Sequence, residues 1–183
     1  MIILSDMDGV VANFVDSILT LYNEEYGENV QYNDITHNDM HLFCRRGRAI
    51  YKYFHQEGLF RGLEVAEGSQ KVINGWLDAG HEVYFVTKPV DHSLYCMKEK
   101  QAWVDEHFPR IGHKNVIFTG HKYLVRGDAL IEDLPTNLEN FRGYGILMAQ
   151  PWNTKVNPRW ASRHDSWEDI DHTVKHLAEI NRS

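Results

Sequence analysis

Segments with the pattern of buried β-strands alternate along this chain with segments in which apolar residues recur at helical spacing. Strands are predicted at residues 1–4, 82–86, 115–118, 129–131 and 144–148. Helices are predicted at residues 10–26, 67–79 and 94–108, and from a capping box at 166–169 onward. This alternation requires crossovers between parallel strands, so it predicts an α/β fold: a Rossmann-like, mainly parallel sheet with helices on both faces.

The stretch between the first two predicted strands is too long for a simple crossover. Residues 33–60 are rich in His, Arg and aromatic residues and have the pattern of short helices. We therefore expect a small helical cap, residues 23–63, inserted into a core made of residues 1–22 and 64–183. The cap would lie over the edge of the sheet at which the strands end.

The composition is that of a globular protein and argues against some functional classes. Of the 183 residues, 43% are hydrophobic, and the net charge of -7 argues against binding to a nucleic-acid polymer. The chain has no apolar run of 18 residues, so we expect no membrane span. Cys44 and Cys96 lack the spacing of a zinc site or a disulfide framework, and two reduced thiols suit a cytoplasmic protein.

The first predicted strand ends in two acidic residues that are separated by one position. Asp6 and Asp8 follow an apolar run, in the stretch SDMDGVVANF. Like charges this close raise each other's proton affinity, so the pair costs stability unless a cation lies between them. A structural turn would need at most one Asp, and we therefore interpret the pair as a functional feature.

Other polar residues are expected at the same edge of the sheet, because the carboxyl ends of parallel strands meet there. The full set is Asp6, Asp8, Thr87, Lys88, Lys122, Asp128 and Asp133. Carboxylate oxygens suit Mg²⁺, and the metal, a lysine and a hydroxyl would together hold a phosphate dianion. The remaining carboxylate could attack phosphorus in line and form an aspartyl-phosphate. The residues thus predict Mg²⁺-dependent chemistry on a phosphate ester.

Four short motifs occur in the order DMDGVVANF, VTKP, GHK and GDALIEDLPTN. In this order they resemble the motifs of the haloacid dehalogenase superfamily of phosphatases. More closely, residues 1–137, which include MKEKQAWVDEHF, resemble the 5'(3')-deoxyribonucleotidases, which dephosphorylate nucleoside monophosphates. The resemblance implies a Mg²⁺-dependent hydrolase of nucleotide metabolism whose substrate is a (deoxy)nucleoside monophosphate.

The resemblance also implies catalytic and metal-binding roles for individual residues. Asp6 would be the nucleophile, and Asp8 would be the general acid and base. The metal would be held by the Asp6 and Asp133 carboxylates and by the backbone carbonyl of Asp8. Asp128 would lie nearby in a supporting role.

By the same resemblance, Thr87 and Lys122 would hold the phosphate, and Lys100 matches a further phosphate-side lysine. Lys88 stands where a small hydroxyl residue commonly follows the threonine, so one phosphate contact would be ionic. Phe14 would line the base pocket. Two alternatives stay open: Lys100 has charged neighbours that suit a solvated helix surface, and Phe14 has the spacing of a core residue.

Other functions fit part of the pattern. A sugar phosphatase or a generalist phosphatase of the same superfamily would use the same motifs, but aromatic residues in the cap (Tyr51, Tyr53, Phe54, Phe60) favour a flat base. A receiver-type phospho-signalling module also uses carboxylates, Thr and Lys, yet it needs adjacent acids on its first strand and no long insertion. The preferred base, the 5' or 3' position of the phosphate and a homodimer are left open by the sequence.

Overall fold

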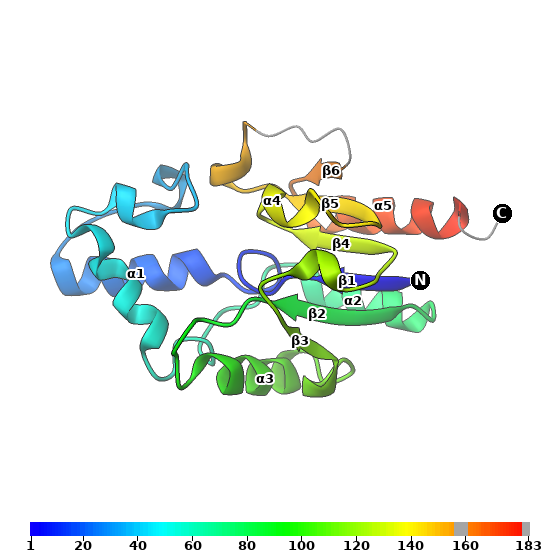
Figure 1. The fold of residues 1–183 in the computed structure, drawn as a ribbon, viewed down its shortest axis with the longest axis horizontal. Helices are drawn as coiled ribbons and strands as arrows, with labels where there is room; N and C mark the ends of the chain where they lie inside the picture. Colours follow the sequence, from blue (N-terminus) through cyan, green and yellow to red (C-terminus); the bar gives the residue numbers. More distant parts are fainter. Residues whose placement is uncertain (156–160, 181–183) are drawn as a thin grey trace.

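The computed structural model describes residues 1–155 and 161–180. Within these residues, six parallel strands form one sheet in the order β3-β2-β1-β4-β5-β6. The strands are β1 (Ile2–Ser5), β2 (Glu82–Thr87), β3 (Val116–Phe118), β4 (Ala129–Glu132), β5 (Tyr144–Met148) and β6 (Ala161–His164). Their carboxyl ends meet at one edge, which faces the cap in Figure 1. The predicted parallel sheet is confirmed.

The helices connect these strands and cover the sheet. The α-helices are α1 (Phe14–Tyr26), α2 (Ser69–Asp78), α3 (Cys96–His107), α4 (Pro135–Leu138) and α5 (Trp167–Ile180). In the part of the chain that the structure describes, six 3₁₀ helices lie between them: η1 (Tyr32–Asp34), η2 (Met40–Phe43), η3 (Gly47–His55), η4 (His113–Asn115), η5 (Lys122–Leu124) and η6 (Pro151–Asn153). No helix among the described residues is long and apolar enough to cross a bilayer.

The two faces of the sheet are buried to different extents. Successive residues of a strand point to opposite faces, so Ile3 and Leu4 belong to two separate apolar clusters. The larger cluster contains side chains of α2, α3 and α5, among them Trp76 and Trp103. The smaller cluster contains Leu138 of the short helix α4. Helices therefore cover both faces as predicted, but one face carries most of the core.

Helix α1 and the cap, which contains η1, η2 and η3, extend beyond the carboxyl ends of the strands (Figure 1). Helix α1 buries Ile18 and Tyr22 on one face, and Gly27, with φ of 63°, ends it in a left-handed conformation. The helix begins at Phe14, four residues later than predicted, because the backbone amides of residues 10–12 all donate to the carbonyl of Met7. The boundary between core and cap stays a prediction.

Strand β6 was not expected from the sequence. Its residues, ASRH, are mostly polar and show no apolar alternation. It pairs with β5 alone, Gly145 opposite Ala161, and so forms the edge of the sheet. An edge strand can be polar because only one of its sides pairs and less of its surface is buried.

Candidate active site

Asp6 lies in the loop that follows β1 and is nearly buried, with 6% of its surface exposed. Its backbone amide donates to the carbonyl of Ile131 at 2.9 Å, which extends the pairing of β1 with β4 by one residue. Its Oδ1 accepts a hydrogen bond from the amide of Met7 at 2.7 Å and lies 2.7 Å from Nζ of Lys122. Backbone pairing and a buried lysine thus fix the position of this carboxylate.

Lys122 contacts two carboxylates, Asp6 and Glu132, from its buried position in η5. Burial alone would lower the pKa of Lys122, but the attraction of Asp6 and Glu132 outweighs burial and raises this pKa above its usual value. Glu132 also accepts hydrogen bonds from Asn137 Nδ2 at 2.9 Å and from the amides of Asp133 and Leu134. Both Glu132 oxygens are therefore occupied in holding Lys122 and the loop after β4.

Asp133 directly follows β4 and comes close to the loop after β1. Its Oδ2 accepts a hydrogen bond from Trp152 Nε1 at 3.1 Å, and its backbone carbonyl accepts one from Asn153 at 2.8 Å. A Cβ on Gly9 would lie 2.8 Å from this Oδ2, and Gly9 has φ of 74°. Both the close approach and the left-handed backbone require glycine at position 9.

Together these side chains make a buried acidic cluster that fits a divalent cation. Asp6, Glu132 and Asp133 each offer a carboxylate oxygen within 4.8 Å of the others. With all three carboxylates ionised, this cluster and Lys122 would carry two net negative charges in a buried site. The pKa of Asp133 is accordingly raised well above its usual range, first by burial and then by Glu132 and Asp6. A cation with two positive charges and a preference for oxygen ligands, such as Mg²⁺, would neutralise this cluster.

Asp8, Thr87 and Lys100 form a second group beside the first. Nζ of Lys100 lies 2.6 Å from Asp8 Oδ2 and donates to Thr87 Oγ1 at 2.7 Å. Asp8 and Thr87 are far apart in the sequence. Burial raises the pKa of Asp8, and the positive charge of Lys100 opposes this rise. Oδ1 of Asp8 is one of two buried side-chain atoms in the described residues that lack a hydrogen-bond partner.

Both groups open into a cavity of about 790 Å³ between the sheet edge and the cap. On the sheet side the cavity is lined by Asp6, Asp8, Lys122 and Asp133, with the exposed Lys88 at its rim. On the cap side it is lined by residues that include Phe14, Tyr51, Phe54, His55 and Arg48. The wall of the cavity on the sheet side is therefore charged, and the opposite wall, on the cap side, is partly aromatic.

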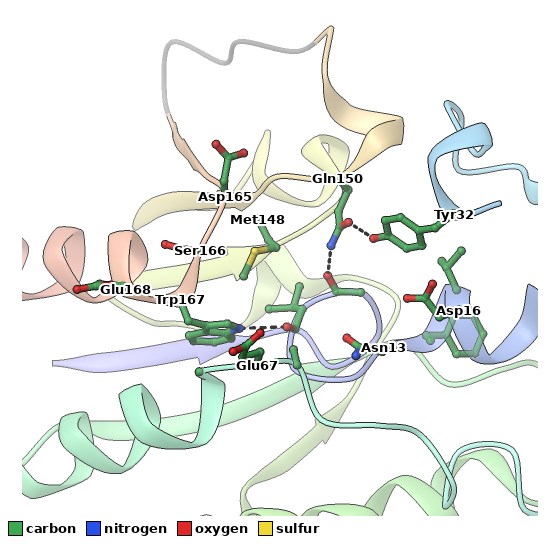
Figure 2. A pocket seen from close by; sticks show the side chains of 16 residues that line it. Asn13, Asp16, Tyr32, Glu67, Met148, Gln150, Asp165, Ser166, Trp167 and Glu168 are labelled. Atoms are coloured by element: carbon green, nitrogen blue, oxygen red, sulfur yellow. Dashed lines mark hydrogen bonds between the residues drawn. The ribbon is translucent and has the colours of Figure 1, made fainter.

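A second, smaller cavity of about 420 Å³ lies on another side of the loop after β1 (Figure 2). In this view Gln150 points toward both Tyr32 and the loop, and its Nε2 donates to the Gly9 carbonyl at 2.6 Å. Trp167 Nε1 donates to the carbonyl of Val10 at 3.3 Å. The loop after β1 is therefore held, on the side of this second cavity, by one side chain that follows β5 and one that begins α5.

Most of the residues predicted for the site come together in the structure. Asp6, Asp8, Thr87, Lys88, Lys100, Lys122 and Asp133 all lie at the carboxyl ends of the strands. Lys100 is completely buried, so the alternative of a solvated helix surface is wrong. Phe14 is 9% exposed, stacks on Phe60 with ring centroids 5.7 Å apart and also lines the larger cavity. It is a core residue, and its contact with a base stays a prediction.

The placement predicted for Asp128 is wrong. This residue precedes β4 and therefore lies at the amino end of the sheet, where its Oδ2 accepts a hydrogen bond from the amide of Ile2 at 2.7 Å. Strand β4 has four residues, which at about 3.3 Å per residue places Asp128 roughly 13 Å from the site. Its hydrogen bond anchors the start of β1 instead.

The sequence reasoning missed three residues that support the site. Glu132 is not among the predicted site residues, yet it belongs to the acidic cluster and holds Lys122. Trp152 and Asn153 contact Asp133 directly. A signal was available: the stretch QPWN follows the apolar strand at 144–148, which is a position at the same edge of the sheet.

Most of the chain is similar in sequence to known proteins. A family model described as "5' nucleotidase, deoxy (Pyrimidine), cytosolic type C protein" matches residues 1–179. A 5'(3')-deoxyribonucleotidase of Bacillus subtilis (strain 168) is 34% identical over 170 residues, which cover 93% of this chain and 96% of that protein. The 5'(3')-deoxyribonucleotidase of Clostridium acetobutylicum is 31% identical over 165 residues, 89% of each chain.

Solved structures extend the similarity of fold. A haloacid dehalogenase family hydrolase from Deinococcus radiodurans R1, with bound phosphate and sodium, aligns with a TM-score of 0.61 at 11% identity, over 96% of this chain and 95% of that chain. A haloacid dehalogenase-like hydrolase from Xanthomonas campestris aligns with a TM-score of 0.59 at 14% identity, over 100% of this chain and 98% of that chain. This chain therefore belongs to the 5'(3')-deoxyribonucleotidase family of 5' nucleotidases, and its fold is that of the haloacid dehalogenase superfamily.

Proposed function

We propose that this enzyme hydrolyses (deoxy)nucleoside monophosphates with Mg²⁺ as cofactor and a phosphoryl group carried transiently by Asp6. The proposal rests on one observation: Asp6, Lys122 and Asp133 lie together on the sheet side of a cavity, and aromatic side chains line its cap side. The charged side of the cavity suits the hydrolysis of a phosphate ester, and the aromatic side offers a surface on which a base can stack.

In the first step, a carboxylate oxygen of Asp6 attacks phosphorus and the bond from phosphorus to the sugar oxygen breaks. Asp8 gives its proton to the departing sugar oxygen, and burial suits Asp8 to this role because it raises the pKa of the carboxyl. Lys100 holds Oδ2 of Asp8, so Oδ1 is the atom left to carry the proton.

In the second step, Asp8 takes a proton from a water molecule, which attacks the phosphorus of the aspartyl-phosphate and releases phosphate and free Asp6. Lys122 and Thr87 hold the phosphoryl oxygens in both steps. Thr87 Oγ1 accepts its hydrogen bond from Lys100, so its own hydroxyl hydrogen can be donated to the phosphoryl group.

Mg²⁺ would be held by the carboxylates of Asp6 and Asp133, with the Asp8 carbonyl as a further ligand. The metal, when bound, supplies positive charge that offsets the charge of the phosphate and of the acidic cluster. Asp6 and Asp133 are better candidates than Glu132, because both oxygens of Glu132 already accept hydrogen bonds.

Phe14 provides the test that separates a nucleotidase from a phosphatase without base recognition. Stacking on an aromatic ring contributes about 1–3 kcal/mol per base, so Phe14→Leu should lower kcat/KM for a deoxynucleoside monophosphate by about fivefold or more. A phosphate ester without a base should be hydrolysed at nearly the wild-type rate. The measurement is phosphate release from both substrates by both proteins.

Phe108 offers the matched control, because it is also a buried aromatic residue and its ring packs 5.1 Å from Phe85, away from the cavity. Phe108→Leu should change the rates for the two substrates by the same factor. Equal losses on the two substrates in Phe14→Leu would assign Phe14 to the core alone and count against base recognition by this ring.

We further propose that the protein is located in the cytoplasm. The formation of a homodimer stays a prediction. Cys44 and Cys96 are both buried and free, which supports a compartment in which thiols stay reduced.

A further inference from the structure

We infer that the segment of residues 150–153, Gln-Pro-Trp-Asn, is the positioning element of the metal carboxylate Asp133 and links that carboxylate to the cap. This inference rests on the proposed function in one respect, because it takes Asp133 as a metal ligand. The segment follows β5 and includes η6, and its side chains reach the loop after β1, Asp133 and the cap.

Trp152 controls the orientation of the Asp133 side chain. Its Nε1 donates to Asp133 Oδ2 at 3.1 Å, and the same oxygen lies against the backbone of Gly9. A carboxylate that is held by a donor on one side and by backbone on the other has little freedom to rotate. Outer partners of this kind keep a metal ligand in a productive orientation.

Asn153 controls the backbone of Asp133. This side chain is completely buried, and its Nδ2 donates to the carbonyls of Asp133 and Met148, each at 2.8 Å. Its Oδ1 accepts hydrogen bonds from the amide of Gln150 at 2.9 Å and from Arg163 Nε at 3.1 Å. One buried amide thus joins the loop after β4 to the loop after β5.

Gln150 and Tyr32 extend this connection to the cap. Gln150 Nε2 donates to the carbonyl of Gly9 at 2.6 Å, and the hydroxyl of Tyr32, which belongs to η1, donates to Gln150 Oε1 (Figure 2). The ring of Tyr32 also meets the ring of Trp152 edge to face, with centroids 5.7 Å apart. A movement of η1 would therefore act on the loop that carries Asp8 and on the indole that holds Asp133.

The experiment is a Mg²⁺ titration of the full-length protein without substrate, read from the rise in melting temperature. Trp152→Phe keeps a ring and removes the N–H, so it should bind Mg²⁺ about tenfold more weakly or worse, as is typical for loss of an outer partner of a metal ligand. At saturating Mg²⁺ the variant should recover most of its kcat, which a general loss of structure would not allow.

Trp76→Phe is the matched control. Trp76 is also buried and its Nε1 donates to a carboxylate, Asp171 Oδ1, at 2.9 Å, but it lies between α2 and α5, away from the site. This variant should lose stability and keep the wild-type affinity for Mg²⁺. An affinity for Mg²⁺ within twofold of wild type in Trp152→Phe would overturn the inference.

A substitute variant covers the case in which Trp152→Phe is unstable. If Trp152→Phe does not fold, Tyr32→Phe takes its place, because it removes only the hydroxyl that contacts Gln150. It should weaken Mg²⁺ binding roughly threefold, the loss expected for one hydrogen bond, and no change would count against the inference. Failure of the wild-type protein to bind Mg²⁺ at all would instead overturn the metal role in the proposed function, and this inference with it.

Discussion

Replacement of Asp6 by Asn is expected to lower turnover of a deoxynucleoside monophosphate by on the order of 10⁴-fold or more. The amide is a poor nucleophile, so the proposed aspartyl-phosphate could not form, and only the contribution of charge and positioning by the rest of the site would remain. The variant should fold, because Asn keeps the shape of Asp6 and its Oδ1 can still accept the hydrogen bond from Met7.

Asp128→Asn is the matched control for this experiment. Asp128 also accepts a hydrogen bond from a backbone amide, that of Ile2. Ile2 is the first residue of β1, whereas Asp6 follows the last. Its replacement should leave turnover within a few-fold of wild type at a temperature below the melting transition. Near wild-type turnover in Asp6→Asn would show that another group attacks phosphorus.

Replacement of Lys122 by Met is expected to damage both stability and activity. Without Lys122, the carboxylates of Asp6, Glu132 and Asp133 face one another with no buried positive charge between them. Removal of one partner of a buried ion pair typically lowers the free energy of unfolding by about 3–5 kcal/mol. Added Mg²⁺ should restore part of this stability and little of the activity, because the proposed contact between a lysine and the phosphate would still be missing.

The loss of stability in Lys122→Met should depend on pH. Burial already raises the pKa of Glu132 and of Asp133 in the folded protein, so the folded state holds protons that the unfolded state has released. A group of this kind destabilises the fold as pH rises above its unfolded pKa, which is about 4 for these residues. Without Lys122 the effect should be stronger, so the variant should be less impaired at pH 5 than at pH 8.

Chemical denaturation at both pH values, without metal, measures this prediction. Lys71→Met, which removes an exposed lysine of α2, is the control and should change the free energy of unfolding by less than about 0.5 kcal/mol. A loss in Lys122→Met that is small and equal at the two pH values would mean that the cluster is not under electrostatic strain.

The parallel sheet and the position of Asp6 and Asp8 at its edge were predictable, because both depend on local sequence. An apolar run followed by Asp6 and Asp8 defines where the strand stops, and the parallel arrangement brings the ends of other strands to the same place. Thr87, Lys122 and Asp133 follow their strands in the same way, so the topology alone placed them correctly.

The environment of Lys100 could not be predicted, because its partner Asp8 is 92 positions away and local spacing suggests a charged surface. The position of Trp152 and Asn153 after β5 indicated the same edge of the sheet, but their contacts with Asp133 form only in the folded chain and could not be predicted. Asp128 was misplaced because it was grouped with residues that follow strands, whereas it precedes one. Polar β6 gave no apolar pattern to detect.

Phosphate release from a deoxynucleoside monophosphate, measured with Mg²⁺ and again after exhaustive chelation, tests the proposed function most directly. A sugar phosphate of similar charge is the comparison substrate under both conditions. With Mg²⁺ we expect kcat/KM for the nucleotide to exceed that for the sugar phosphate by about tenfold or more, in line with the energy of base stacking. Chelation should abolish both activities. Full activity without a divalent cation, or equal rates on the two substrates, would contradict the account.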